Sequence, residues 1–379
     1  MDDREAMQEA IVCARSVEGR TSPRPPVGAV LVRDNVIVGR GATSPPYGPH
    51  AEIHALNEAG ANAYGADLYT TLEPCCVTIH TPPCTRAIIE AGIHRVVVGT
   101  LDPNPLVCTR GVEQLREAGI EVVTAIEEQE TSELIRPFAA FITKGRPYVT
   151  AKWAMTLDGK LATRTGDAYW ISGSAARVWV HNLRDRVDAI LVGSGTARAD
   201  NPLLTVRLAA EQRSHERSPR QGPLRVVLAT QGHLPDHLHL LQPDLAAGTC
   251  VIVGTTCSKA QRQHLQEYGI DVIAVAVDGA GRIDLGAALQ TLASKGILHV
   301  LIEGGHRLLG NVFDRAMIDH VAIFIAPKLV GGADAPSPIG GDGLTSMKHA
   351  RHLHKKNIQV IDRDLLVEGD VFYEEEQRS

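Results

Sequence analysis

The sequence predicts an α/β protein of two domains, because three of its features agree on this class. The chain has 379 residues, which is more than one ordinary domain of about 100 to 200 residues. Short apolar segments of strand type alternate with segments of helical spacing, as in a sheet covered by helices. The segment Lys144-Gly-Arg-Pro147 interrupts this pattern, and we expect domains of residues 1–144 and 145–379.

In the first domain, apolar residues at helical spacing predict a helix over residues 2–17. Two apolar segments joined by a tight turn predict strands over 27–32 and 36–38. The elements that follow are a helix over 50–59, a strand over 67–72, a helix over 81–91, a strand over 95–99, a helix over 112–118 and a strand over 120–123. This order implies a mixed sheet flanked by helices.

A connecting helix is expected over residues 127–135, and the second domain then repeats the alternation. Residues 211–222, rich in Arg, Gln, Ser and His, predict an exposed loop. The expected helices are 174–186, 258–268 and 285–294, and the expected strands are 148–155, 189–193, 224–229, 250–254, 272–277 and 299–302.

Composition and charge narrow the classes of function. Lys and Arg number 38 and Asp and Glu 44, which gives a net charge of −6 and argues against a nucleic-acid partner, since such proteins usually carry a basic domain or stripe. No segment approaches the roughly 18 apolar residues of a membrane helix. The charged residues 2–5 precede no apolar segment of signal-peptide type. We therefore expect a cytoplasmic protein without nucleic-acid or membrane partners.

The seven cysteines, with Cys75, Cys76 and Cys84 close together, indicate metal or thiol chemistry and not a disulfide framework. His50, Cys75 and Cys84 match a catalytic zinc site, because two thiolates and one imidazole leave a tetrahedral ion one open position for water. Glu52, two residues after His50, can take the proton of that water and pass it to a leaving amine.

The arrangement His-x-Glu, Pro-Cys and a second Cys is the known signature of zinc-dependent base deaminases, and we identify it here by matching that pattern. Two residues of the same loop, Cys76 and His80, are competing candidate ligands. We expect Cys76 to be a small packing residue, since adjacent side chains rarely point the same way.

The second domain lacks a Gly-x-Gly-x-x-Gly motif at its first strand-to-helix turn, which argues against a classical dinucleotide fold. Instead, Leu301-Ile-Glu-Gly-Gly-His306 predicts a strand that enters glycines and then a helix. Such glycines let backbone N–H groups approach a phosphate, although an ordinary glycine turn has the same pattern. Gly193-Ser-Gly-Thr196, which follows another expected strand, predicts a second turn of this kind. Arg184 and Arg207 suit either a substrate phosphate or surface ion pairs.

Motifs in both halves resemble those of the bifunctional riboflavin-biosynthesis deaminase/reductases, in the same order and over nearly the whole chain. The resemblance implies a cytidine-deaminase-like fold for the first domain and a dihydrofolate-reductase-like fold for the second. It implies one zinc ion per chain on His50, Cys75 and Cys84, with Glu52 as the proton shuttle. The matching motifs are His50-Ala-Glu52, Thr71-Leu-Glu-Pro-Cys75, Asp102-Pro-Asn-Pro105, Gly145-Arg-Pro-Tyr148, Trp170-Ile-Ser172, Gly193-Ser-Gly-Thr196 and Glu303-Gly-Gly305.

The resemblance also implies the substrates. The first domain would remove the 2-amino group of a diamino-phosphoribosylamino-pyrimidinone, a phosphorylated pyrimidine, by hydrolysis. The second would use NADPH to reduce the ribose of the product to a ribityl chain. A homo-oligomer is expected from the family. The implied NADPH-binding residues are Ala154, Trp170, Thr196, Asp200, Thr230 and Gly305, and the implied substrate-binding residues are Arg184, Leu204, Arg207 and Glu303.

The chain departs from the family pattern in three deaminase loops, at 22–25, 76–80 and 109–111, where Thr109 stands in place of a usual glycine. One alternative is therefore a reductase of this pathway whose deaminase domain acts on another amino-heterocycle. Another is a nucleotide-binding regulatory protein with a structural zinc. Glu52 argues against the latter, because a structural site normally recruits a fourth protein ligand and needs no free carboxylate.

Overall fold

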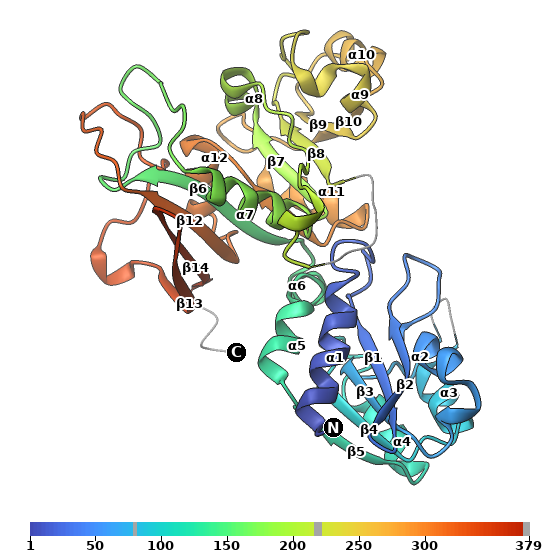
Figure 1. Cartoon of the computed structure of the whole chain (residues 1–379). Helices are drawn as coiled ribbons and strands as arrows, with labels where there is room; N and C mark the ends of the chain where they lie inside the picture. Colours follow the sequence, from blue (N-terminus) through green and yellow to red (C-terminus); the bar gives the residue numbers. More distant parts are fainter. Residues whose placement is uncertain (79–81, 216–221, 374–379) are drawn as a thin grey trace. The chain divides into compact units, whose positions relative to one another are not determined.

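The computed structural model describes residues 1–78, 82–215 and 222–373. It contains two compact units, formed mainly by residues 1–147 and 148–379, and each is built on one β-sheet with helices (Figure 1). This architecture confirms the predicted α/β class. None of the helices in the described residues is long and apolar enough to cross a membrane.

The first unit contains a five-stranded mixed sheet. Its strand β1 pairs antiparallel with β2 and β3, whereas β3, β4 and β5 run parallel. Parallel strands end at the same edge of a sheet, so the segments that follow β3 and β4 emerge side by side. In spatial order the strands are β2 (Val36–Ala42), β1 (Gly28–Arg33), β3 (Asp67–Leu72), β4 (Arg95–Thr100) and β5 (Glu121–Thr124).

The helices of the first unit pack closely on this sheet. A β-carbon at Gly28 would collide with the backbone of Ala10, and one at Gly41 would collide with the backbone of Ala51, so glycine permits the close approach of a helix to β1 and of another to β2. The helices are α1 (Asp3–Arg15), α2 (Ala51–Ala59), the 3-10 helix η1 (Gly60–Ala63), α3 (Cys84–Glu90), α4 (Arg110–Glu117), α5 (Glu128–Leu134) and α6 (Arg136–Lys144).

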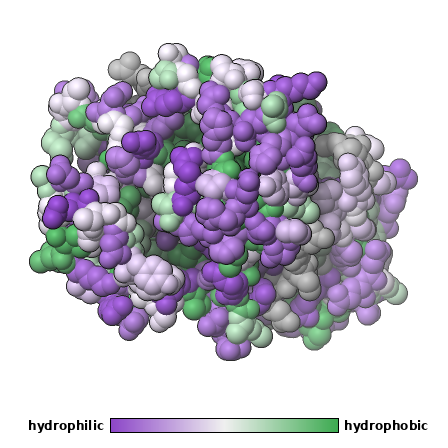
Figure 2. All heavy atoms as spheres, turned by 90° about the horizontal axis from the view of Figure 1, so that it is seen from above, coloured by the Kyte–Doolittle hydropathy of each residue, from purple (hydrophilic) through white to green (hydrophobic). Residues whose placement is uncertain are grey.

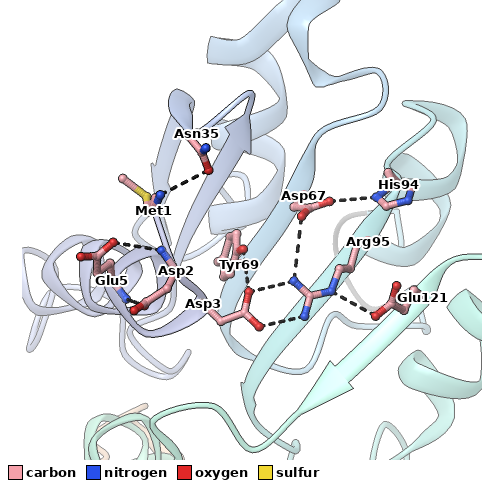
Figure 3. Close-up of polar contacts among 10 residues, drawn as sticks. All are labelled: Met1, Asp2, Asp3, Glu5, Asn35, Asp67, Tyr69, His94, Arg95 and Glu121. Carbon is pink, nitrogen blue, oxygen red and sulfur yellow. Dashed lines mark hydrogen bonds and ion pairs between the residues drawn. The ribbon is translucent and has the colours of Figure 1, made fainter.

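A polar network joins the start of α1 to the sheet (Figure 3). The Arg95 guanidinium, at the start of β4, donates to both carboxylate oxygens of Asp3 at 2.8 Å. The Tyr69 hydroxyl of β3 donates to the same carboxylate at 2.9 Å. Arg95 also pairs with Glu121 of β5 at 3.2 Å. One guanidinium therefore ties α1 to two parallel strands.

The second unit contains a nine-stranded sheet. Seven of its strands form a parallel set, and β14 runs antiparallel to β12 and β13. In spatial order the strands are β10 (Asp271–Val275), β9 (Thr249–Gly254), β8 (Leu224–Leu228), β7 (Ala189–Gly193), β11 (His299–Ile302), β6 (Tyr148–Thr156), β12 (His320–Ala326), β14 (Asp364–Phe372) and β13 (His352–Ile361).

Helices cover the parallel part of this second sheet, and every residue of β9 is buried, as expected for a strand between two covered faces. The helices of this unit are α7 (Ser174–Arg184), α8 (Ser194–Asp200), η2 (Ala210–Gln212), η3 (His239–Leu241), α9 (Pro243–Ala246), α10 (Lys259–Glu267), α11 (Leu285–Ser294), α12 (His306–Asp314) and η4 (Met347–His349).

The predicted elements are present, with some differences at their ends and in number. The helix predicted over 81–91 begins at Cys84, and Thr81 lies outside the described residues. The segment after β7 was predicted as a turn but forms α8. Strands β12 to β14 and helix α6 were not predicted. Of the loop predicted over 211–222, residues 211–215 are exposed, although 211 and 212 form the end of η2, and residues 216–221 lie outside the described residues. On the face seen in Figure 2, hydrophilic side chains predominate and apolar ones lie among them in small groups.

Candidate active sites

In the first unit, three predicted ligand side chains converge from three separate elements. His50 immediately precedes α2, Cys75 follows β3, and Cys84 begins α3. The Nδ1 atom of His50 lies 3.5 Å from the Sγ atom of Cys75 and 3.2 Å from that of Cys84. All three ligand atoms lie within 4.8 Å of one another. Two sulfurs and one imidazole nitrogen at this spacing fit a single zinc ion.

The surroundings favour the deprotonated sulfur that a metal requires. The Cys84 backbone N–H, at the start of α3, donates to the Cys75 sulfur at 3.3 Å. Hydrogen bonds from the Cys84 thiol and from His50 lower the pKa of Cys75 to about 4. The pKa of Cys84 is raised in turn by its hydrogen bond to Cys75. Thiolates are typically stabilised at helix N-termini and beside basic groups.

Glu52 lies in the first turn of α2, and only 4% of its surface is exposed. Burial raises the pKa of this carboxyl to about 7, which suits a group that must both accept and donate a proton near neutral pH. Of the competing ligands, Cys76 is partly buried and is not a member of the metal cluster. His80 lies outside the described residues.

Two further buried carboxylates beside the cluster were part of quoted motifs but had no predicted role. Glu73 is 3% exposed and Asp102 is 7% exposed. Burial raises the pKa of Asp102 to about 6. Their positions were the signal available in the sequence. Glu73 follows β3 and Asp102 follows β4, and these two buried strands run parallel to each other.

In the second unit, the two predicted glycine turns meet at neighbouring strands. Gly305 caps α12, and its N–H donates to the Thr196 hydroxyl of α8 at 3.0 Å. A β-carbon at Gly305 would lie 3.1 Å from that hydroxyl oxygen. The turns follow β11 and β7, which pair in parallel. The carboxyl ends of such strands and the N-termini of the following helices are where α/β proteins bind phosphate-containing ligands.

Arg184 and Glu303, both predicted to bind substrate, pair with each other. Two hydrogen bonds of 2.7 Å join the guanidinium to the carboxylate, and the side chains are only 12% and 13% exposed. Although burial opposes ionisation of Glu303, the Arg184 charge holds its pKa below the ordinary value. Arg184 also donates to the Thr205 carbonyl oxygen at 3.0 Å. The pair thereby fixes the segment that follows α8.

Arg207 is exposed and lies in this same segment. Its guanidinium donates to the Thr205 hydroxyl at 2.7 Å, and its backbone N–H donates to His181 Nδ1 at 3.2 Å. Burial and the nearby arginine charges lower the pKa of His181 to about 4. The side chain of Leu204 is buried in the apolar core. Of the predicted substrate residues, Arg207 therefore presents a charged group to solvent.

The remaining predicted NADPH residues are distributed over several elements of the second unit. Trp170 is half-exposed, with the Arg177 guanidinium 4.3 Å from its ring centre. Burial raises the pKa of Asp200, the last residue of α8. Ala154 lies on β6, and the Thr230 carbonyl accepts a hydrogen bond from Gly254 at 2.8 Å.

Two protein families match the chain. Residues 1–100 match the family described as the cytidine and deoxycytidylate deaminase zinc-binding region, and residues 147–367 match the RibD C-terminal domain. The riboflavin biosynthesis protein RibD of Bacillus amyloliquefaciens is 42% identical over 95% of this chain and 94% of its own length. That of Aquifex aeolicus is 40% identical over 96% of this chain and 97% of its own.

A comparison with solved structures indicates the same family. Acinetobacter baumannii RibD, form 1, superposes with a TM-score of 0.83 at 34% identity, covering 98% of this chain and 99% of that one. Fold and sites define a two-domain enzyme, a zinc-dependent deaminase joined to an NADPH-dependent reductase. The chain belongs to the RibD family of bifunctional riboflavin-biosynthesis enzymes. Family membership excludes the hypothesis of a regulatory protein with a structural zinc.

Proposed function

We propose that the first domain deaminates 2,5-diamino-6-(5-phosphoribosylamino)pyrimidin-4(3H)-one and that the second reduces the product to 5-amino-6-(5-phosphoribitylamino)uracil. A Thermotoga maritima relative, 33% identical over 98% of this chain, is described as a diaminohydroxyphosphoribosylaminopyrimidine deaminase and 5-amino-6-(5-phosphoribosylamino)uracil reductase. The observation that carries the deaminase half is the convergence of His50, Cys75 and Cys84 close to the buried Glu52.

In the proposed deaminase site, His50, Cys75 and Cys84 hold the zinc ion. When bound, zinc supplies a water that is acidic enough to yield hydroxide near neutral pH. The Glu52 carboxylate accepts the proton of that water and delivers it to the leaving amine. Burial, which raises the pKa of this carboxyl, favours a group that both accepts and donates a proton.

In the proposed reductase site, Thr196 and Gly305 bind NADPH with Ala154, Trp170, Asp200 and Thr230. NADPH supplies the hydride, and the protein supplies orientation and electrostatics. Arg207 binds the substrate phosphate, for which its exposed guanidinium is suited. Leu204 contributes through its backbone, because its side chain is in the core. The Arg184–Glu303 pair holds the segment that carries Arg207.

We also infer the wider context of the enzyme. The net charge of −6 argues against nucleic-acid partners, and we expect a cytoplasmic homo-oligomer with functional domains of residues 1–144 and 145–379. The substrate and NADPH are anionic, so local arginines and helix N-termini must attract them against the overall field.

The decisive experiment supplies the purified protein with the diaminopyrimidine phosphate, with and without NADPH, and follows product mass. Deamination is expected without NADPH, and a gain of two hydrogens is expected only with it. If the 2-amino group is retained while the deaminated compound is still reduced, the proposed deaminase substrate is wrong, and the result favours a deaminase domain that acts on another amino-heterocycle.

Glu52→Gln tests the assignment of the proton shuttle. We expect deamination to fall by about 10² to 10⁴, the usual contribution of a general acid/base. Zinc content, measured by atomic absorption, should stay near that of the wild type, and reduction of the deaminated compound should be unchanged. Loss of zinc in this variant would make Glu52 a ligand and contradict the assignment.

A further inference from the structure

Glu73 lies two residues before Cys75 and directly after β3. Its backbone N–H donates to the Thr100 carbonyl of β4 at 2.9 Å, which extends the contact between the two strands. Its carboxylate is almost fully buried, with 3% of the residue exposed. A buried carboxylate requires compensating hydrogen bonds, and those of Glu73 all come from the protein backbone in the described residues.

Each carboxylate oxygen of Glu73 accepts two backbone N–H groups. Oε1 accepts from Gly111 at 3.0 Å and Val112 at 3.2 Å. Oε2 accepts from Thr109 at 3.0 Å and Asp102 at 3.2 Å. The four donors lie at the two ends of the segment 101–109 and in the first turn of α4. One side chain therefore closes this loop.

The Glu73 carboxylate also caps α4. Thr109 occupies the N-cap position of this helix, but its side chain makes no capping hydrogen bond. Glu73 supplies the missing acceptor from another part of the chain, and a negative charge is favourable at the positive end of a helix.

The closed loop belongs to the surroundings of the metal cluster. Gly111 packs against the Pro74 carbonyl so closely that a β-carbon would collide with it. The Thr85 N–H of α3 donates to the Cys75 carbonyl at 3.2 Å, and the Thr85 hydroxyl donates to Gln114 of α4 at 2.7 Å. The Cys75 turn, α3 and α4 are thus joined by direct contacts, and the Glu73 carboxylate adds the loop to them.

We propose that Glu73 is a positioning residue of the deaminase, whose carboxylate holds loop 101–109 against the metal site in the arrangement that binds substrate. This inference rests on the proposed deaminase function of that site. A glutamine of the same size offers one acceptor oxygen and places an NH₂ group against backbone donors. Glu73→Gln therefore removes one of the two acceptor oxygens that hold the loop, without removing a candidate metal ligand.

Thr109 provides an independent test of this role. Its φ of 63° is in the left-handed region that residues with a β-carbon rarely adopt, and its N–H is held by Glu73. Glycine adopts this conformation readily. The conformation of loop 101–109 should therefore depend less on the Glu73 carboxylate when residue 109 is glycine.

The experiment compares the zinc-loaded full chain with Glu73→Gln, Glu73→Asp, Thr109→Gly and the Glu73→Gln/Thr109→Gly double variant. For Glu73→Gln we expect the KM of the diaminopyrimidine phosphate in deamination to rise at least about tenfold, a typical loss for hydrogen bonds to a charged group. The rise should be smaller in the Thr109→Gly background and in Glu73→Asp, which keeps the carboxylate. Zinc content and reductase activity should stay unchanged.

A KM within twofold of the wild type, loss of zinc, or an equal rise in both Thr109 backgrounds would overturn the proposal. Amide hydrogen exchange supplies a readout that needs no substrate. Exchange of the N–H groups of residues 102, 109, 111 and 112 should accelerate in Glu73→Gln while that of α1 stays unchanged, and unaltered exchange would overturn the proposal. If the wild type does not deaminate the compound, the proposed function fails, and the exchange result still decides the role of Glu73.

Discussion

Thr109 has a backbone conformation that its side chain disfavours. The family that this chain resembles usually has glycine at position 109, and the φ of 63° explains why glycine suits this position. A threonine in the left-handed region is strained by about 1 kcal/mol or more. The strain persists because Glu73 and the start of α4 fix the backbone on both sides.

Thr109→Gly should consequently raise the free energy of unfolding by up to about 1 kcal/mol. The change is measured by unfolding the protein with urea and following a spectroscopic signal of the first unit. Thr109→Ala is the matched control, because alanine keeps a β-carbon and the strain. An equal gain in both variants would show that the backbone conformation is not the cause.

Among the elements, α1 depends on the Asp3–Arg95 contact. The hydrogen bonds from Arg95 lower the pKa of Asp3 below its ordinary value. A carboxyl whose pKa is lower in the folded state stabilises the protein above its unfolded pKa near 4, and this contribution disappears as the pH falls through the folded value. Both side chains are partly exposed, so the contribution is modest.

Asp3→Asn should lower the free energy of unfolding by about 1 kcal/mol at pH 7. The difference from the wild type should shrink as the pH falls below about 4, because Asp3 of the wild type then becomes protonated. Urea denaturation at a series of pH values checks this. A difference that is constant from pH 7 to pH 2 would contradict the assignment.

The Arg184–Glu303 pair joins α7 to the residue that follows β11. Because the pair is largely buried, removal of one partner leaves a charge without compensation. Glu303→Gln should destabilise the second unit by about 3 kcal/mol.

The double variant Arg184→Met/Glu303→Leu is the matched control and should be less destabilised than Glu303→Gln alone, because it removes both charges of the pair and does not leave Arg184 without its partner. Thermal unfolding of both variants measures the difference. A larger destabilisation of the double variant would show that the pair contributes mainly through packing.

At the scale of the whole molecule, the metal cluster and the predicted reductase residues belong to different compact units. A ligand that binds only the folded state stabilises the unit that contains its site. Removal of zinc by a chelator should abolish deamination, lower the unfolding temperature of the first unit and leave NADPH-dependent reduction intact. Added zinc should restore deamination. Parallel loss of both activities would contradict this separation.

Much of the fold was predictable from local patterns. Helix α1 has apolar residues at helical spacing, and strands β1, β3 and β4 are short segments that are buried along nearly their whole length. The candidate ligands His50, Cys75 and Cys84 follow a spacing that only a few chemistries require. Helix α8 was missed because it begins at Ser194, directly after the last residue of β7, and is only seven residues long. Strand β13 was missed because it is mostly exposed and polar at an edge of the sheet.

The sequence by itself determined the class of the protein and predicted two domains and the candidate metal ligands His50, Cys75 and Cys84, because periodicity and ligand type are properties of neighbouring residues. Only the tertiary structure decided which charged groups meet. It pairs Arg184 with Glu303 across 119 positions and brings four backbone donors to Glu73 across 29 to 39 positions. Such pairings depend on strand order and helix packing, which bring together side chains and backbone groups that no local pattern relates.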